Sequence, residues 1–294
     1  MREHNSLVTI PPTWQVERAC AIAEKHDQVF DGSPDILRAV RNALTNGQLE
    51  LYYQQKIALR DHTHSGFEAL LRWKTQDGHV LAPASFLAAL DDPSLSMAIG
   101  NHVISLAIAQ ARRWMLDQVP FVSVAINLSA SQFTEPELAN RILNSIATSN
   151  LDPAMIEVEV TEGVFLSATT EGVLKVCKVL KQGGVRIAFD DFGTGFASLT
   201  HLRDFPVDTI KIDRSFVYQL GRRHNTTVIV NAMVGLAHNL SMSIVAEGVE
   251  TQAQAEFLRA ISCDAAQGYF FARPVPPREA AKALQACYQT AEIG

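Results

Sequence analysis

The chain has 294 residues, 47% of them hydrophobic and 19% charged, which is typical of a soluble globular protein with a large core. Its formal net charge of −6 gives no general attraction to nucleic acid polymers or to an anionic membrane, so neither is an expected partner. No apolar run approaches the roughly 18 residues that cross a bilayer, the N-terminus is not typical of a signal peptide, and the cysteines lack zinc-site spacing. We therefore expect a cytoplasmic protein without a membrane span.

The first part of the chain differs in character from the rest. Residues 13–30 have a weak helical pattern, which ends at a glycine followed by a serine–proline pair. That pair is a helix-start signal and predicts a helix over residues 35–45. We predict that residues 1–33 form an N-terminal helical extension or linker, and that residues 34–294 form the main domain.

From residue 49 onward the pattern alternates between strands and helices, which favours a (β/α) barrel. The alternative is an open doubly wound sheet, but neither of the two glycine-rich phosphate loops common in such folds is present in the sequence. We predict strands at 49–59, 66–73, 121–128, 156–160, 185–191, 209–212, 243–249 and 265–271, and helices at 83–90 and 97–114.

Polar residues recur on these strands or at their ends, although polar groups in core strands are costly unless they are paired or bind metal. In a (β/α) barrel the carboxyl ends of the strands meet at one mouth, where active sites are built. A single such residue is usually a satisfied core group, but one from nearly every strand indicates a shared site. These residues are Glu68, Asn127, Glu159, Asp190, Asp191, Lys211, Glu247 and Gln267.

Two adjacent carboxylates, Asp190 and Asp191, end an apolar run just before Gly193. Neighbouring side chains on a strand point in opposite directions, so both acids serve one site only where the strand ends and twists. The alternative is an ordinary strand-to-loop turn rich in aspartate. Oxygen ligands without histidine favour Mg²⁺ or Mn²⁺, and several acids can hold two ions about 3.5–4 Å apart for displacement at phosphorus. Lys211 could stand near the attacking water, or it could form a structural ion pair.

Seven short motifs carry a resemblance to a known family. The chain is similar to the bacterial EAL-domain cyclic-di-GMP phosphodiesterases from about residue 36 to residue 277. The resemblance implies a modified TIM (β/α)8 barrel of the EAL type, here with an N-terminal helical extension, that hydrolyses cyclic di-GMP to linear pGpG. The motifs are Phe67-Glu68-Ala69-Leu70-Leu71-Arg72-Trp73, Asn127-Leu128-Ser129, Glu159-Val160-Thr161-Glu162, Asp190-Asp191-Phe192-Gly193-Thr194-Gly195, Ile210-Lys211-Ile212-Asp213, Ala246-Glu247-Gly248-Val249-Glu250 and Gln267-Gly268-Tyr269.

The resemblance also implies roles for individual residues. One metal would be bound by Glu68, Asn127, Glu159 and Asp190, and a second by Asp191 with Asp190 and Glu247. The substrate would be held by Gln54, Leu70, Arg72, Asp213 and Gln267. The catalytic set would be Lys211, which polarises or deprotonates water, with Glu68, Glu247 and Glu162. Glu162 would anchor the loop 191–199, which couples the metal site to a dimer interface, so a homodimer is expected. Family members usually have proline and an aliphatic residue where Gln55 and Lys56 stand.

Three functions remain open from the sequence. The first is an active phosphodiesterase that uses two Mg²⁺ or Mn²⁺ ions and is inhibited by Ca²⁺, whose looser coordination suits the two-metal geometry poorly. The second is a receptor of the same fold that binds cyclic di-GMP without cutting it. The third is a protein that acts mainly by binding a regulatory partner through residues 1–33.

Overall fold

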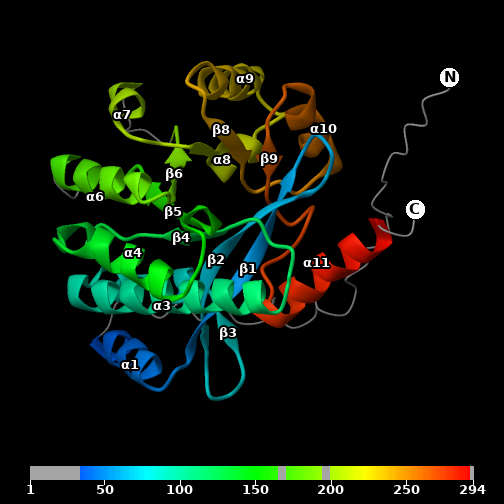
Figure 1. Ribbon diagram of the computed structural model, residues 1–294. Helices are drawn as coiled ribbons and strands as arrows, with labels where there is room; N and C mark the ends of the chain where they lie inside the picture. Colours follow the sequence, from blue (N-terminus) through cyan, green and yellow to red (C-terminus); the bar gives the residue numbers. More distant parts are fainter. Residues whose placement is uncertain (1–33, 165–169, 194–198, 292–294) are drawn as a thin grey trace.

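The computed structural model describes residues 34–164, 170–193 and 199–291, and within them eight strands close into a barrel (Figure 1). Of the nine strands in the sheet, β3 (Val80–Leu81) pairs only with β2, and the other eight form the ring. These are β1 (Leu49–Ala58), β2 (His64–Lys74), β4 (Val124–Asn127), β5 (Ile156–Thr161), β6 (Arg186–Phe192), β7 (Thr209–Ile212), β8 (Ser243–Ala246) and β9 (Ala265–Ala266).

The barrel departs from a regular (β/α)8 ring at its first strand. Strand β1 runs antiparallel to both of its neighbours, β2 and β9, whereas the pairs from β2 through β4 to β9 are parallel. The carboxyl ends of the seven parallel strands therefore meet at one end of the barrel, and β1 brings its own amino half to that end.

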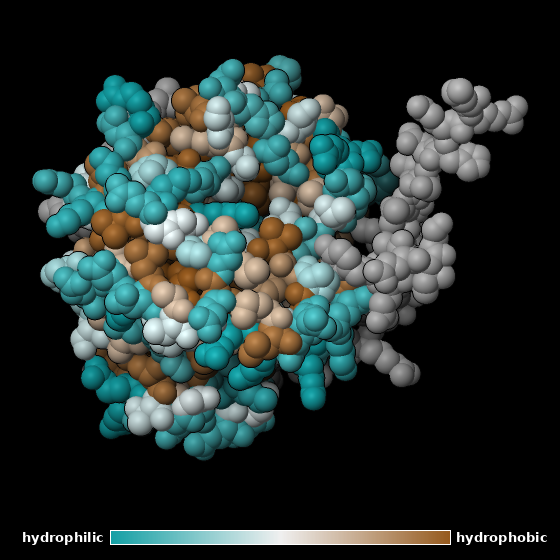
Figure 2. All heavy atoms as spheres, viewed as in Figure 1, coloured by the Kyte–Doolittle hydropathy of each residue, from teal (hydrophilic) through white to brown (hydrophobic). Residues whose placement is uncertain are grey.

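Helices cover the outside of the barrel, and Figure 1 shows α3, α4 and α6 side by side against the strands. Figure 2 shows mostly hydrophilic side chains on the outer faces in this view, with apolar side chains in the furrows between them. The helices are α1 (Pro34–Thr45), α2 (Leu87–Asp91), α3 (Pro93–Leu116), α4 (Leu138–Thr148), α6 (Thr170–Gln182), α7 (Leu199–Asp204), α8 (Arg214–Tyr218), α9 (His224–Asn239), α10 (Gln252–Ala260) and α11 (Pro277–Ala291). Short 3₁₀ helices cover Pro83–Phe86, Gln132–Thr134 and Pro153–Met155.

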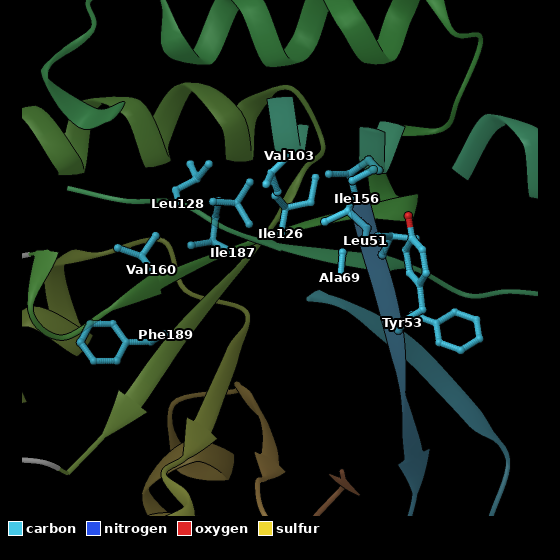
Figure 3. Packing of buried hydrophobic residues seen from close by; sticks show 14 of the residues in the cluster. Leu51, Tyr53, Ala69, Val103, Ile126, Leu128, Ile156, Val160, Ile187 and Phe189 are labelled. Atoms are coloured by element: carbon cyan, nitrogen blue, oxygen red, sulfur yellow. The ribbon is translucent and has the colours of Figure 1, made fainter. Parts of the chain in front are cut away.

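The longest helix among the described residues, α3, is capped at its start by a local sequence signal. The carboxylate of Asp92 accepts a hydrogen bond from the Leu95 amide at 2.8 Å, and Pro93 occupies the first helical position. The helix therefore begins four residues before the predicted Met97. Its buried face includes Val103, which lies near Ile126 of β4 in the core between the helices and the barrel (Figure 3).

Several predicted boundaries differ from the observed ones. The predicted strand at 265–271 is only Ala265–Ala266, because the chain then turns back and the Phe270 amide donates to the Val249 carbonyl at 3.0 Å. The predicted helix at 83–90 is divided into a 3₁₀ turn and α2. The weak helical pattern at 13–30 lies outside the described residues, so the predicted extension and the domain boundary stay predictions. None of the helices within the described ranges is both long enough and apolar enough to cross a membrane.

Candidate active site

Four carboxylates surround the ammonium group of Lys211 at the carboxyl ends of the parallel strands. The Nζ atom of Lys211 lies 2.6 Å from Glu247 Oε1 and 2.7 Å from Glu159 Oε2. It lies 3.1 Å from Asp190 Oδ2 and 3.7 Å from Glu68 Oε2. The Lys211 side chain is 1% exposed, so these carboxylates replace water as the partners of its charge.

The strands bring these groups together through their two-residue alternation. In β5, Val158 and Val160 face the helices and Glu159 faces the barrel interior, and Figure 3 shows Val160 within the outer core. The parallel register places Asn127 of β4 directly beside Glu159. Side chains from neighbouring strands thus reach the same level of the interior.

Glu68 is fixed by two amide side chains. Its Oε1 accepts a hydrogen bond from Asn127 Nδ2 at 2.9 Å, and its Oε2 accepts one from Gln267 Nε2 at 2.5 Å. Gln267 also donates to Glu247 Oε1 at 3.3 Å, which links two of the acids. Burial disfavours the charged form of Glu68, but the charge of Lys211 and the two amide hydrogen bonds outweigh it and lower the pKa of this carboxyl.

The other acids are harder to ionise. Burial raises the pKa of Glu159 well above its ordinary value, and neighbouring carboxylates add to the effect. Burial also raises the pKa of Glu247 to about 8, although the charge of Lys211 opposes the shift. The pKa of Asp191 rises to about 6 through burial and the nearby charge of Asp190. The cluster carries more negative charge than one lysine neutralises, so further positive charge would stabilise its ionised form.

An irregularity in β6 lets the adjacent acids Asp190 and Asp191 serve one site. The register with β7 shifts between Phe189 and Phe192, and Asp191 has φ of 57°, in the left-handed region. Oδ1 of Asp190 accepts a hydrogen bond from the Asp191 amide at 2.9 Å. The strand bulges here, so these two neighbouring side chains do not point to opposite faces as they would on a regular strand.

The donor set fits a hard divalent cation. Oxygen atoms of Glu68, Glu159 and Asp190 all lie within 4.8 Å of one another, and so do those of Asp190, Asp191 and Glu247. Asp190 belongs to both groups, as expected for a carboxylate shared between two ions. Glu159 Oε1 is buried without a hydrogen-bond partner among the described residues, so it retains a free lone pair. Oxygen donors of this kind are those preferred by Mg²⁺ and Mn²⁺.

A family model described as the EAL domain matches residues 37–274. The chain belongs to the EAL domain family. It is 36% identical over 244 residues to the bifunctional diguanylate cyclase/cyclic di-GMP phosphodiesterase MucR of Pseudomonas aeruginosa, across 83% of this chain and 36% of that protein. It is 38% identical over 240 residues to the signaling protein YkoW of Bacillus subtilis, across 82% of this chain and 30% of that protein.

The EAL domain also resembles solved structures. The structure titled PaMucR phosphodiesterase, c-di-GMP complex, matches with a TM-score of 0.79 and 36% identity over 83% of this chain and 99% of that one. The chain spans about a third of the length of the two curated relatives. The predicted family and the predicted modified TIM barrel are both confirmed.

The residues predicted to bind substrate surround the carboxylate cluster of the EAL domain. Leu70 and Arg72 follow Glu68 on the same face of β2, farther toward the carboxyl end of the strand. Gln54 is the cross-strand neighbour of Glu68, and its Nε2 donates to a backbone carbonyl at 3.0 Å. Asp213 caps α8 by accepting a hydrogen bond from the Ser215 amide at 3.0 Å. The Arg72 guanidinium donates to the Leu71 carbonyl at 2.7 Å and lies 5.8 Å from the centre of the Tyr52 ring, but it forms no ion pair with a described residue, so its charge remains available to an anion.

Glu162 is the residue predicted to anchor the loop 191–199. It follows β5 directly, is buried, and its amide donates to the carbonyl of Asp190 at 3.3 Å. Residues 194–198 of the loop that it is predicted to anchor lie outside the described residues. The anchoring role therefore stays a prediction.

Two further charged residues inside the EAL barrel were not predicted as part of any site. Lys56 of β1 and Glu157 of β5 form a buried ion pair with 2.5 Å between Nζ and Oε1. The two-residue spacing between Glu157 and Glu159 indicates that Glu157 also faces the barrel interior, because residues so spaced on a strand share a face. No local signal in the sequence indicates that Lys56 is its partner.

Proposed function

We propose that this EAL domain is a two-metal-dependent phosphodiesterase that hydrolyses cyclic di-GMP to linear pGpG. The main support is the pair of overlapping carboxylate groups around Asp190, because such a pair suits two divalent ions near a phosphodiester. The name of MucR as a cyclic di-GMP phosphodiesterase, and the presence of c-di-GMP in the PaMucR phosphodiesterase structure, support the choice of substrate. A cytoplasmic location, a homodimer and a regulatory partner for residues 1–33 are further parts of the proposal.

The residues of the cluster would divide between two ions. The ions would act as Lewis acids, stabilising charge on the phosphate and lowering the pKa of bound water. The first ion would be held by Glu68, Asn127, Glu159 and Asp190, and the second by Asp190, Asp191 and Glu247.

The remaining residues would hold the substrate and orient the water. Lys211 contacts carboxylates of both groups, so its ammonium group would lie close enough to polarise the attacking water or a non-bridging oxygen. The guanidinium of Arg72 would bind a phosphate, as planar fork donors do. Gln267 would keep Glu68 oriented through their hydrogen bond. Gln54, Leu70 and Asp213 would contact the rest of the substrate.

The proposal is tested by turnover of cyclic di-GMP by purified protein. The protein is stripped with EDTA and returned to Mg²⁺, Mn²⁺ or Ca²⁺, and pGpG is separated by chromatography. We expect product with Mg²⁺ or Mn²⁺ and none with EDTA, and we expect added Ca²⁺ to inhibit. Binding of cyclic di-GMP without product under every metal condition would identify a receptor instead.

A pair of variants tests the ligand assignment. Glu68→Ala removes a carboxylate from the cluster and is expected to abolish turnover. Glu171→Ala removes an exposed carboxylate at the start of α6 and is expected to leave turnover unchanged. Normal turnover by Glu68→Ala would show that Glu68 is not a required ligand.

A further inference from the structure

We propose that Lys56 and Glu157 are positioning residues of the EAL site, which hold Glu159 in place from the side of the barrel interior that faces the amino ends of the parallel strands. This inference rests on the proposed function, because it concerns the readiness of Glu159 to bind a divalent cation. Neither residue belongs to the set expected to touch metal or substrate.

The observation is a continuous row of charges through the barrel interior. Lys56 Nζ lies 2.5 Å from Glu157 Oε1 and 3.9 Å from Glu159 Oε1. Glu159 Oε2 in turn lies 2.7 Å from Lys211 Nζ. Each of these four side chains is at most 5% exposed, so solvent screens their interactions little. Glu159 is therefore held between two cations, one on each side.

The fold provides room for this row. Glu157 and Glu159 share the inner face of β5, and Thr209 of β7 donates its hydroxyl to Glu157 Oε2 at 3.4 Å. Lys56 stands opposite Gly66 in the β1–β2 register. A Cβ atom at Gly66 would lie 3.2 Å from Lys56 Cε and 2.7 Å from Ser123 Oγ. The absence of a side chain at Gly66 thus leaves space for the lysine.

The pair also separates the site from the other end of the barrel. A cavity of about 570 Å³ opens at the amino ends of the parallel strands, and Lys56 and Glu157 line it together with the first residues of β6, β7 and β8. Glu159 is the next inward-facing residue of β5 after Glu157, so it lies farther from the cavity and closer to the carboxyl ends of the strands. Lys56 therefore supports Glu159 from the cavity side, while Lys211 contacts it from the site.

Glu159 needs this support because of its free oxygen. Its Oε1 has no hydrogen-bond partner among the described residues, and Lys56 is the cation that faces it. Without Lys56, only the single contact of Oε2 with Lys211 would fix the carboxylate, and its rotation would carry Oε1 away from the neighbouring ligands. Residues that orient metal ligands in this way typically change metal affinity or activity by about 10–100-fold when they are removed.

The decisive variant is the double substitution Lys56→Met with Glu157→Leu. It removes one positive and one negative charge, so the net charge near the site is unchanged while Glu159 loses the cation that faces its Oε1. We expect Mn²⁺ affinity, measured by calorimetry without substrate, and kcat each to fall at least about tenfold. The KM for cyclic di-GMP should change by less than about twofold, because no substrate contact is lost.

Three other variants complete the experiment. Lys56→Arg keeps the charge and should retain Mn²⁺ affinity within about threefold of the wild type. Glu157→Asp keeps both charges but draws Lys56 away by one methylene, so it should fold and show an intermediate loss; it carries the test if the double variant does not fold. Arg141→Met with Glu135→Gln removes a partly buried ion pair outside the barrel and should leave Mn²⁺ affinity unchanged.

The outcomes separate the two proposals. A folded double variant with wild-type Mn²⁺ affinity and kcat overturns the positioning role and leaves the proposed function intact. Wild-type Mn²⁺ affinity in Glu157→Asp has the same meaning when the double variant is unfolded. A wild-type protein that neither binds Mn²⁺ nor forms pGpG overturns the proposed function, and the positioning role with it.

Discussion

Replacing His64 by leucine is expected to make the barrel less sensitive to acid. His64 lies at the start of β2, is 8% exposed, and neither ring nitrogen has a hydrogen-bond partner among the described residues. Burial lowers the pKa of His64 from 6.5 to about 3, and the positive charge of Lys56 adds to the effect. The folded protein therefore keeps this ring neutral at pH values where the unfolded chain binds a proton.

The sign and the size of the effect follow from this difference. Because the folded pKa is depressed, the unfolded state takes up more protons as pH falls below 6.5, so the stability contributed by neutral His64 is lost in acid. Between about pH 7.5 and about pH 5 the loss amounts to about 2 kcal/mol of unfolding free energy. His64→Leu cannot bind a proton at this position, so it should lack this part of the pH dependence.

The assay is urea unfolding, followed by tryptophan fluorescence in EDTA, at several pH values across this range. The carboxylates of the cluster also titrate here, so the informative quantity is the difference between the wild type and His64→Leu. Exposed His79→Gln serves as the control and should follow the wild type. Equal pH slopes for the wild type and His64→Leu would show that the His64 ring is protonated or hydrated in the folded state.

Three further predictions concern a turn, two thiols and a loop. A Cβ atom at Gly268 would lie 2.1 Å from the Val249 carbonyl oxygen. Gly268→Ala should therefore lower the unfolding free energy by about 2–3 kcal/mol and reduce turnover. Gly235 has open space around it, so the control Gly235→Ala should change neither quantity. In a Cys20→Ser, Cys287→Ser variant the remaining thiols are those of Cys177 and Cys263. Both are buried, and burial raises the pKa of each to about 12. They should react with a disulfide reagent at least about a hundredfold more slowly in the folded state than in urea, and equal rates would contradict their burial. Glu162→Ala should lower kcat without changing Mn²⁺ affinity in calorimetry, and wild-type kcat would remove its predicted role in the loop.

The inward-facing side chains of the strands were predictable because the two-residue alternation of a strand determines them. In β5 the apolar Val158 and Val160 flank Glu159, and alternation on a strand then assigns the acid to the opposite face from the core. Parallel pairing places Asn127 of β4 beside Glu159, and closure of the barrel brings Lys211 of β7 into contact with Glu159. The alternation and the parallel arrangement therefore predicted that Asn127, Glu159 and Lys211 would meet inside the barrel.

Irregular backbone was not predictable in the same way. Asp191 faces the site because the β6–β7 register shifts after Phe189 and because its φ is positive. Neither feature follows from residue alternation, which by itself would send Asp190 and Asp191 to opposite faces. The predicted strand at 265–271 failed for a related reason, since the chain turns back on Val249 soon after Ala266.

The Lys56–Glu157 pair shows a different limit of sequence reasoning. The two residues are 101 positions apart; Lys56 directly follows two glutamines in β1, and Glu157 is one of two glutamates in β5. Their contact depends on the antiparallel insertion of β1, which turns the second half of that strand toward the amino ends of the others. It also depends on Gly66, whose replacement by any larger residue would push on the Lys56 side chain. Lys56 can be buried here because β1, β2 and β5 place Lys56, Gly66 and Glu157 next to one another. These three residues come together only in the closed barrel and not within any single segment of the sequence.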